Sequence, residues 1–145
     1  GDPVEESLRY AEEIQNYLIL RKKKACFFDW TFLGVGPDGH TASLFPGHSL
    51  KNSNKLCETT EHPKTGQRRI TMTPLAINNS RRITYHAIGK KKAEIVFKLA
   101  TDPSASNIFP AAQIRGEWFL DKEAASRLDL DLINKLGKKQ IIAPK

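Results

Sequence analysis

Residues 33–47 read LGVGPDGHTASLFPG and close an apolar segment that begins at Cys26. The segment over residues 26–35 is rich in aromatic and β-favouring side chains and runs directly into the glycine turn GPDGH at residues 36–40. This order of an apolar segment followed by a glycine turn predicts a buried parallel strand, then a tight turn, then a short helical segment over residues 41–45. In open α/β sheets, ligands bind beyond the carboxyl ends of the strands, so this turn is the expected position of a functional site.

Upstream of this stretch, residues 2–20 are predicted to form a helix. Asp2 is a suitable N-cap and Pro3 suits the first helical position. Apolar side chains then recur at intervals of three and four residues and so share one helix face: Leu8, Ala11, Ile14 and Leu18. We expect this face to pack against the rest of the domain.

Downstream, the pattern predicts strands over residues 69–74, 82–88 and 117–120, with a helix over residues 89–100. Residues 48–67 are polar and are expected to form a surface loop that leads to a hairpin or edge strand. Asp121 is expected to cap a further helix. Strands that alternate with helices favour an α/β fold, with an open, largely parallel sheet flanked by helices.

The length of the chain suits one compact domain. A chain of 145 residues can bury a real hydrophobic core. We assign residues 1–127 to this domain and residues 128–145 to a C-terminal tail. Leu128, Leu132 and Leu136 recur every four residues, which predicts that the tail contains a helix.

Composition argues against several classes of function. The formal net charge is +7, but the basic clusters are not interleaved with the aromatic side chains that base stacking needs, so we expect no nucleic-acid partner. No apolar run approaches the roughly 20 residues that span a bilayer, and the N-terminus does not resemble a signal peptide, so a soluble, cytoplasmic protein is expected. Cys26 and Cys57 lack metal-ligand spacing and are interpreted as free thiols.

The glycine turn carries residues that suit proton transfer. Gly36 and Gly39 allow a close approach of the backbone to a ligand. Asp38 and His40 form the kind of pair that moves a proton near neutral pH, with His40 able to deprotonate water and Asp38 able to orient it. On the tripeptide alone, a plain helix N-cap is the favoured interpretation.

A wider match extends beyond the turn. Residues 33–47 resemble the signature of 6-phosphogluconolactonases, and three later segments agree with that family in order and spacing: RITMT at 69–73, GKKKA at 89–93 and WFLD at 118–121. The resemblance covers roughly residues 1–126. It implies a Rossmann-like fold of the sugar-phosphate isomerase and lactonase type, here without the opening βα units that precede this region in the family.

The resemblance also implies an activity, namely hydrolysis of 6-phospho-D-glucono-1,5-lactone to 6-phospho-D-gluconate in the pentose phosphate pathway, which supplies NADPH. This carboxylic ester hydrolysis needs no cofactor and no metal. By the resemblance, the catalytic residues are His40 and Asp38, and the substrate-binding residues are Gly36, Gly39, Ser43, Arg69 and Lys92. Fusion to, or association with, glucose-6-phosphate dehydrogenase is a further implied partner arrangement.

One physical argument supports Lys92 independently. Residues 90–92 are three lysines at the start of the predicted helix, where the macrodipole disfavours positive charge by about 0.3–1 kcal/mol each. A bound phosphate would remove this conflict, although three solvated lysines could also tolerate it.

Two alternative functions stay open. Glucosamine-6-phosphate deaminases share the fold and a similar turn, but their pattern continues toward Asn-Glu-Pro, whereas residues 43–46 read SLFP. A non-catalytic sugar-phosphate-binding module is the second alternative, because the opening half of the domain is not in this chain. Of the other histidines, His48 and His62 are interpreted as solvated loop residues, and His86 as a packed strand residue.

Overall fold

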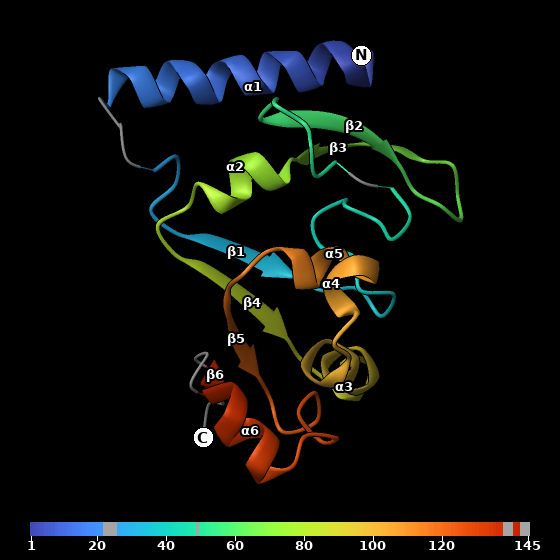
Figure 1. The fold of residues 1–145 in the computed structure, drawn as a ribbon. Helices are drawn as coiled ribbons and strands as arrows, with labels where there is room; N and C mark the ends of the chain where they lie inside the picture. The colour runs from blue at the N-terminus through green and yellow to red at the C-terminus, as the bar shows by residue number, and fades with distance from the viewer. Residues whose placement is uncertain (22–25, 49, 138–140, 143–145) are drawn as a thin grey trace.

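The computed structural model describes residues 1–21, 26–48, 50–137 and 141–142. Figure 1 shows the arrangement of its helices and strands. In chain order these are α1 (Pro3–Leu20), β1 (Thr31–Gly34), β2 (Cys57–Glu61), β3 (Arg68–Met72), α2 (Pro74–Asn78), β4 (Ile83–Ala87), η1 (Lys90–Lys92), α3 (Ala93–Thr101), α4 (Ala105–Ile108), α5 (Pro110–Gln113), β5 (Glu117–Leu120), α6 (Leu130–Gly137) and β6 (Ile141–Ile142).

A parallel sheet and a separate hairpin organise the described residues. The sheet has the strand order β1-β4-β5-β6, and each of its three strand pairs is parallel. In register, Leu33 of β1 lies beside Tyr85 of β4, which lies beside Trp118 of β5. Strands β2 and β3 form the antiparallel hairpin. The predicted α/β fold with an open, largely parallel sheet is therefore confirmed.

The main core lies between the sheet and helices α3 and α5. Inward-facing residues of the strands pack there with apolar residues of the two helices: Leu33, Val35, Ile83, Tyr85, Ala87, Leu120, Ile95, Val96 and Ala111. Tyr85 has no exposed surface and stacks on Trp118, with ring centroids 4.3 Å apart and an interplanar angle of 8°. Burial raises the pKa of the Tyr85 hydroxyl, which donates a hydrogen bond to the Ile114 carbonyl.

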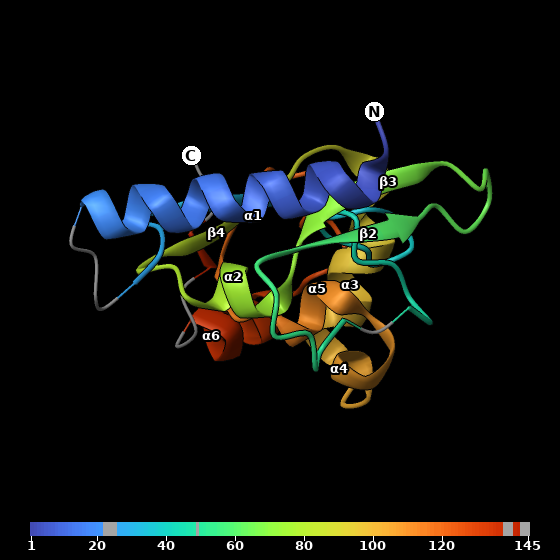
Figure 2. The same ribbon diagram turned by 90° about the horizontal axis from the view of Figure 1, so that it is seen from above.

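A second apolar cluster joins α1 to the hairpin. Figure 2, which looks down on the molecule, shows α1 lying across β2 and β3. Ile14 and Leu18 of α1 pack with Leu56 and Cys57 at the start of β2. The Asp2 side chain accepts a hydrogen bond from the Val4 N–H, which confirms the predicted cap. The buried apolar face is shorter than predicted, because Leu8 is 54% exposed.

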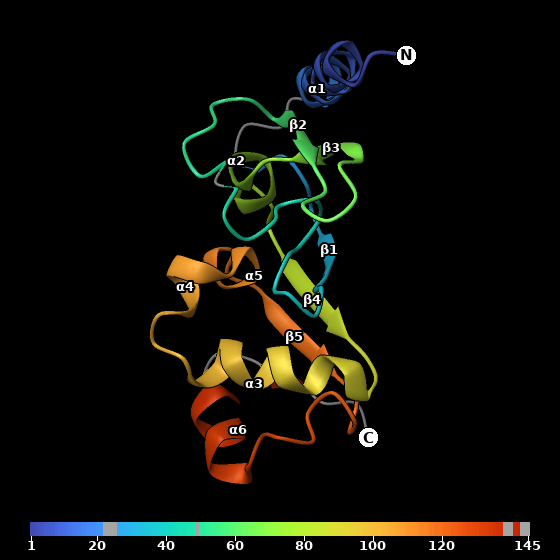
Figure 3. The same cartoon turned by 90° about the vertical axis from the view of Figure 1, so that its right-hand side faces the viewer.

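The opposite face of the sheet carries exposed aromatic residues. Figure 3 shows α3, α4 and α5 gathered on one side of β1, β4 and β5, whereas none of the described elements covers the other side. On that side, Phe32 is 59% exposed and stacks on Trp30, with the ring centroids 4.7 Å apart. The His86 ring lies 5.5 Å from the Phe32 ring and 5.5 Å from the Phe119 ring. Within the described residues, β1 is also an edge strand.

Several elements differ from the sequence-based predictions. The strand predicted over residues 26–35 is limited to β1, because its partner β4 begins only at Ile83, which pairs with Thr31. Upstream of Thr31, one isolated bridge joins Phe28 to Ser80. The strand predicted over residues 69–74 is the hairpin strand β3 and does not belong to the parallel sheet.

The helices after β4 also differ in detail. The helix predicted over residues 89–100 starts as the 3-10 turn η1, and α3 follows it. Asp121 does accept a hydrogen bond from the Ala124 N–H, but the chain then forms turns rather than the predicted helix, and α6 begins only at Leu130. Helix α6 lies in the predicted tail, of which residues 138–140 and 143–145 are outside the described residues. None of the helices described is long and apolar enough to cross a membrane.

We expect replacement of Tyr85 to destabilise the fold. Tyr85→Ala removes a fully buried ring from the main core, so it should lower the free energy of unfolding by about 3–5 kcal/mol, measured by urea denaturation. Tyr17→Ala is the matched control, because Tyr17 is 54% exposed on α1 and its loss should change the free energy by no more than about 0.5 kcal/mol. Equal losses in the two variants would contradict the assignment of the core.

Candidate active site

The glycine turn lies at the carboxyl end of β1, as predicted. Backbone hydrogen bonds close it on itself: the Gly36 N–H donates to the His40 carbonyl at 2.8 Å, and the Gly39 N–H donates to the Gly36 carbonyl at 2.9 Å. The Ala111 N–H donates to the Gly39 carbonyl at 3.0 Å and so ties the turn to the start of α5. The turn is therefore held by the domain as well as by its own backbone.

Both glycines of the turn are required by close packing. A Cβ atom at Gly36 would lie 2.1 Å from Nδ1 of His40, so the His40 ring rests where any side chain at Gly36 would be. A Cβ atom at Gly39 would lie 2.4 Å from the Phe109 ring, and the φ angle of Gly39 is +82°, a conformation that favours glycine. These two positions fix where the imidazole of residue 40 can lie.

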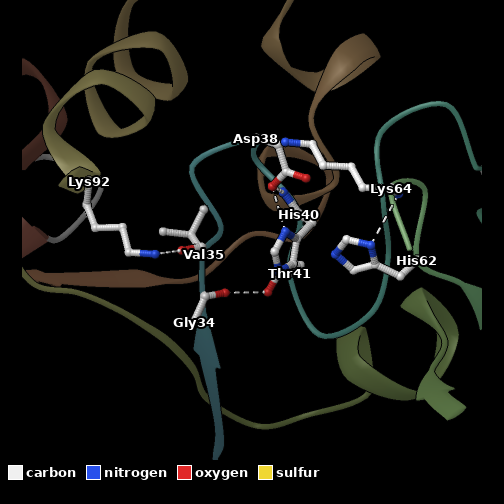
Figure 4. Close-up of polar contacts among 8 residues, drawn as sticks. All are labelled: Gly34, Val35, Asp38, His40, Thr41, His62, Lys64 and Lys92. Carbon is white, nitrogen blue, oxygen red and sulfur yellow. Dashed lines mark hydrogen bonds and ion pairs between the residues drawn. The ribbon is translucent and has the colours of Figure 1, made fainter. Parts of the chain in front are cut away.

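Asp38 and His40 are bonded to each other. Nδ1 of His40 lies 2.6 Å from Oδ1 of Asp38, and the His40 backbone N–H donates to the same oxygen at 3.2 Å. Burial raises the pKa of the Asp38 carboxyl, but the hydrogen bonds from His40 outweigh it, so the net pKa lies below its ordinary value. An ionised Asp38 accepts the proton of Nδ1, and Nε2 of His40 is then left with the lone pair that a general base needs. Figure 4 shows this pair beside Gly34 and Val35.

The short helix predicted over residues 41–45 is wrong. Residues 41–44 form a tight turn, in which the Leu44 N–H donates to the Thr41 carbonyl at 2.9 Å. Ala42 has a φ angle of 51°, a left-handed conformation that an α-helix does not continue. The Ser43 N–H in this turn donates to Oγ1 of Thr71 at 3.1 Å.

Thr41 anchors the turn to β1, a role that the sequence analysis missed. Its Oγ1 donates to the Gly34 carbonyl at 2.8 Å, and the residue is fully buried (Figure 4). The buried hydroxyl is satisfied by a strand carbonyl seven residues earlier in the chain. A threonine directly after His40 gives no sequence signal for this bond, because it depends on how sharply the chain reverses.

Lys92 reaches the same loop from the other side. Its Nζ donates to the Val35 carbonyl at 2.6 Å, one residue before Gly36 (Figure 4). In this position the ammonium group holds the carboxyl end of β1 and lies beside the turn. The structure thus brings Lys92 to the predicted site across 57 residues of sequence.

Arg69 lies on the side of the site formed by Phe45. The Arg69 guanidinium lies 5.8 Å from the centroid of the Phe45 ring and takes its orientation from Oε1 of Gln67, which accepts two hydrogen bonds from it. The His40 ring lies 5.1 Å from the same Phe45 ring, which is only 1% exposed. Phe45 therefore lies between the arginine and His40 of the Asp38–His40 pair.

Ser43 is held by backbone contacts with the hairpin. Its N–H donates to Thr71 of β3, and its carbonyl accepts a hydrogen bond from Oγ1 of Thr60 in β2 at 3.0 Å. The hairpin therefore fixes the outer part of the turn. Of the predicted residues, Gly36, Asp38, Gly39 and His40 lie together in the turn. Lys92 is linked to the turn through the Val35 carbonyl, and Arg69 through the Phe45 ring. Ser43 is bonded to the hairpin.

Two cavities in the described part of the chain have linings that do not include His40. One of about 730 Å³ is lined by residues near the amino ends of β4 and β5, including Arg81, Ile83 and Trp118. The other, of about 170 Å³, is lined by Phe45 and His48 among others. His40 itself has a side chain that is 28% exposed. Among the described residues, no group of three histidine, cysteine or acidic side chains is placed to hold a metal ion.

The parallel sheet and the bonded Asp–His pair on the loop at its carboxyl edge define a class of α/β proteins. The chain belongs to the glucosamine-6-phosphate isomerase/6-phosphogluconolactonase family, whose model matches residues 1–120. This finding confirms the family resemblance of the sequence.

Individual relatives agree with this membership. The chain is 42% identical over 106 residues to a 6-phosphogluconolactonase of Haemophilus influenzae, a match that covers 70% of this chain and 46% of the relative. It is 36% identical over 134 residues to a 6-phosphogluconolactonase of Homo sapiens, which covers 87% of this chain and 50% of the relative. The chain thus spans about half the length of these relatives.

Solved structures show the same relationship. A crystal structure of a devB protein superposes with a TM-score of 0.80 at 36% identity and covers 89% of this chain and 56% of that chain. The 6-phosphogluconolactonase from Trypanosoma cruzi gives a TM-score of 0.68 at 27% identity, with 88% and 53% covered. A monomeric glucosamine-6-phosphate deaminase gives 0.61 at 28% identity, with 83% and 52% covered.

We expect a methyl group at Gly36 to displace the His40 ring. Gly36→Ala places a Cβ atom on Nδ1 of His40, so the hydrogen bond to Asp38 should be lost, measured by the ¹⁵N and ¹H shifts of the His40 ring in NMR spectra. Gly34→Ala is the control two residues away, because a Cβ atom there meets nothing within 4 Å. Unchanged His40 signals in the Gly36 variant would show that the ring does not rest on this glycine.

Proposed function

We propose that this protein takes part in the hydrolysis of 6-phospho-D-glucono-1,5-lactone to 6-phospho-D-gluconate, with His40 as the general base. The observation that carries the proposal is the 2.6 Å contact between Asp38 and Nδ1 of His40, which leaves Nε2 free to accept a proton. The proposed substrate and reaction are those indicated by the names of the relatives, which are 6-phosphogluconolactonases. The chain spans about half the length of those relatives. Activity of this chain by itself is therefore proposed as well.

In the proposed reaction, a water molecule loses a proton to Nε2 of His40 as its oxygen attacks C1 of the lactone. The negative charge moves to the carbonyl oxygen, and the ionised Asp38 stabilises the imidazolium that forms. Collapse of the tetrahedral intermediate breaks the bond between C1 and the ring oxygen. The imidazolium of His40 returns its proton to this oxygen, so the product is the open-chain acid and the base is regenerated.

The proposed phosphate contacts are cationic. Lys92 lies beside the turn through its bond to the Val35 carbonyl, and Arg69 lies over Phe45, next to His40. Gly36, Gly39 and Ser43 are proposed to line the path of the sugar ring, since small residues keep the main chain open to a ligand. The same proposal assigns the protein to the cytoplasm and to the pentose phosphate pathway, where it would support NADPH supply, alone or with glucose-6-phosphate dehydrogenase.

A second candidate is a glucosamine-6-phosphate deaminase or isomerase activity. The structural match to a monomeric deaminase favours it, and the family description includes it. Residues 43–46, SLFP, lack the glutamate of the Asn-Glu-Pro pattern that the sequence analysis associates with deaminases. Parallel assays with the lactone and with glucosamine 6-phosphate separate these two activities, and binding of 6-phosphogluconate without turnover would instead support the non-catalytic module.

Replacement of His40 should abolish most of the lactone turnover. His40→Ala removes the proposed base, so kcat should fall by about 10² or more while binding of 6-phosphogluconate changes little, measured by an assay of lactone hydrolysis and by calorimetry. His48→Ala is the control, because His48 is exposed and forms no part of the proposed base. A His40 variant with full activity would eliminate His40 as the base.

Replacement of Lys92 should weaken binding of the phosphorylated substrate. Lys92→Gln removes one charge-assisted contact, so KM should rise by about 10- to 100-fold with the phosphorylated lactone and much less with the unphosphorylated lactone. Lys91→Gln is the control, because Lys91 is the exposed neighbour in the same turn. An equal effect on both lactones would instead assign Lys92 to holding the turn through the Val35 carbonyl.

A further inference from the structure

His62 lies in the turn between β2 and β3, and two backbone hydrogen bonds to its ring indicate the tautomer of the neutral imidazole. Nδ1 of His62 faces the backbone N–H groups of Lys64 at 3.2 Å and Thr65 at 3.3 Å. Both of these groups are donors, so Nδ1 must accept with its lone pair. The ring proton of the neutral imidazole is therefore on Nε2.

The backbone around His62 keeps the ring in this position. The His62 N–H donates to the Gln67 carbonyl at 2.9 Å, and the His62 carbonyl accepts from the N–H groups of Thr65 and Gly66 at 3.2 and 2.9 Å. His62 is thus bonded on both sides of its own peptide unit and through Nδ1. A ring bonded in this way differs from the solvated loop histidine that the sequence suggested.

The His62 ring also belongs to the same aromatic group as His40. Its centroid lies 5.1 Å from that of Phe45, at an interplanar angle of 69°, and the His40 centroid lies 5.1 Å from that of Phe45 as well. The two imidazoles therefore contact one buried ring. In Figure 4 the ring nitrogen of His62 that is not bonded to Lys64 faces His40.

The donor on Nε2 has no acceptor among the described residues. His62 is partly buried, and its one polar ring contact in this part of the chain is made through Nδ1. A donor that faces the catalytic pair without a protein partner is suited to bind an oxygen of a ligand. Sugar hydroxyl and ring oxygens accept such a bond from a neutral donor.

We propose that His62 is a substrate-binding residue of this site, whose Nε2–H donates a hydrogen bond to an oxygen of the sugar. This inference rests on the proposed function, since it assigns His62 to the site of His40. His62 holds the substrate before and during the reaction, whereas His40 accepts the proton. Loss of the His62 contact should therefore raise KM and leave kcat almost unchanged.

His62→Asn is the informative variant. The Oδ1 atom of asparagine can replace Nδ1 as the acceptor for the Lys64 and Thr65 N–H groups, but asparagine has no donor at the position of Nε2. The turn is expected to be retained while the contact with the sugar is lost. His48→Asn is the matched control, because it makes the same chemical change at an exposed histidine.

The experiment measures binding of 6-phosphogluconate and of glucosamine 6-phosphate to the chain, together with lactone turnover. We expect His62→Asn to weaken binding of 6-phosphogluconate by about 3- to 10-fold, with kcat retained and with no change in the His48 control. ¹⁵N NMR should show the proton of His62 on Nε2 in the free protein, and the His62 signals should shift when 6-phosphogluconate is added.

The outcomes separate the two proposals. Normal lactone turnover with unchanged ligand binding in His62→Asn overturns the role of His62 and leaves the proposed function in place. Weakened binding of glucosamine 6-phosphate in this variant, without lactone turnover in the parent chain, supports the role of His62 and overturns the lactonase function. Absence of binding by both ligands, or a proton of His62 on Nδ1, overturns the assignment of His62.

Discussion

The site depends on the close contact between the His40 imidazole and the bare α-carbon of Gly36. Because Gly36 has no side chain, the ring can lie over the turn, where Nδ1 meets the Asp38 carboxylate at 2.6 Å. Thr41 then ties the far side of the turn to the Gly34 carbonyl, and Lys92 ties the near side to the Val35 carbonyl. These contacts make the short loop a fixed support for the His40 ring.

Burial and exposure are divided between the two faces of the parallel sheet. Leu33 and Tyr85 face the helices α3 and α5, whereas Phe32 and His86 face outward together with Trp30. Parallel sheets in α/β proteins are usually covered on both faces, and the described residues cover only one. The chain also spans about half the length of relatives such as the human 6-phosphogluconolactonase.

The sequence predicted some elements well because their signals are local. The capped helix α1 and the strand β5, with bounds Glu117–Leu120, follow from cap residues and short-range patterns. The helix predicted over residues 41–45 failed because the left-handed Ala42 is imposed by the reversal of the chain and not by a local preference. The strand over residues 26–35 was too long because its length depends on where the distant strand β4 begins.

By itself, the sequence determined the parallel α/β class, the family and the position of Asp38 and His40 on a glycine turn, since each is encoded in contiguous residues. Only the tertiary structure decided what stands around that turn. Phe45 meets His62, and Lys92 meets Val35, through contacts between segments that are distant along the chain. Such contacts depend on how the hairpin and α3 pack against the loop, and no local pattern of residues specifies that packing.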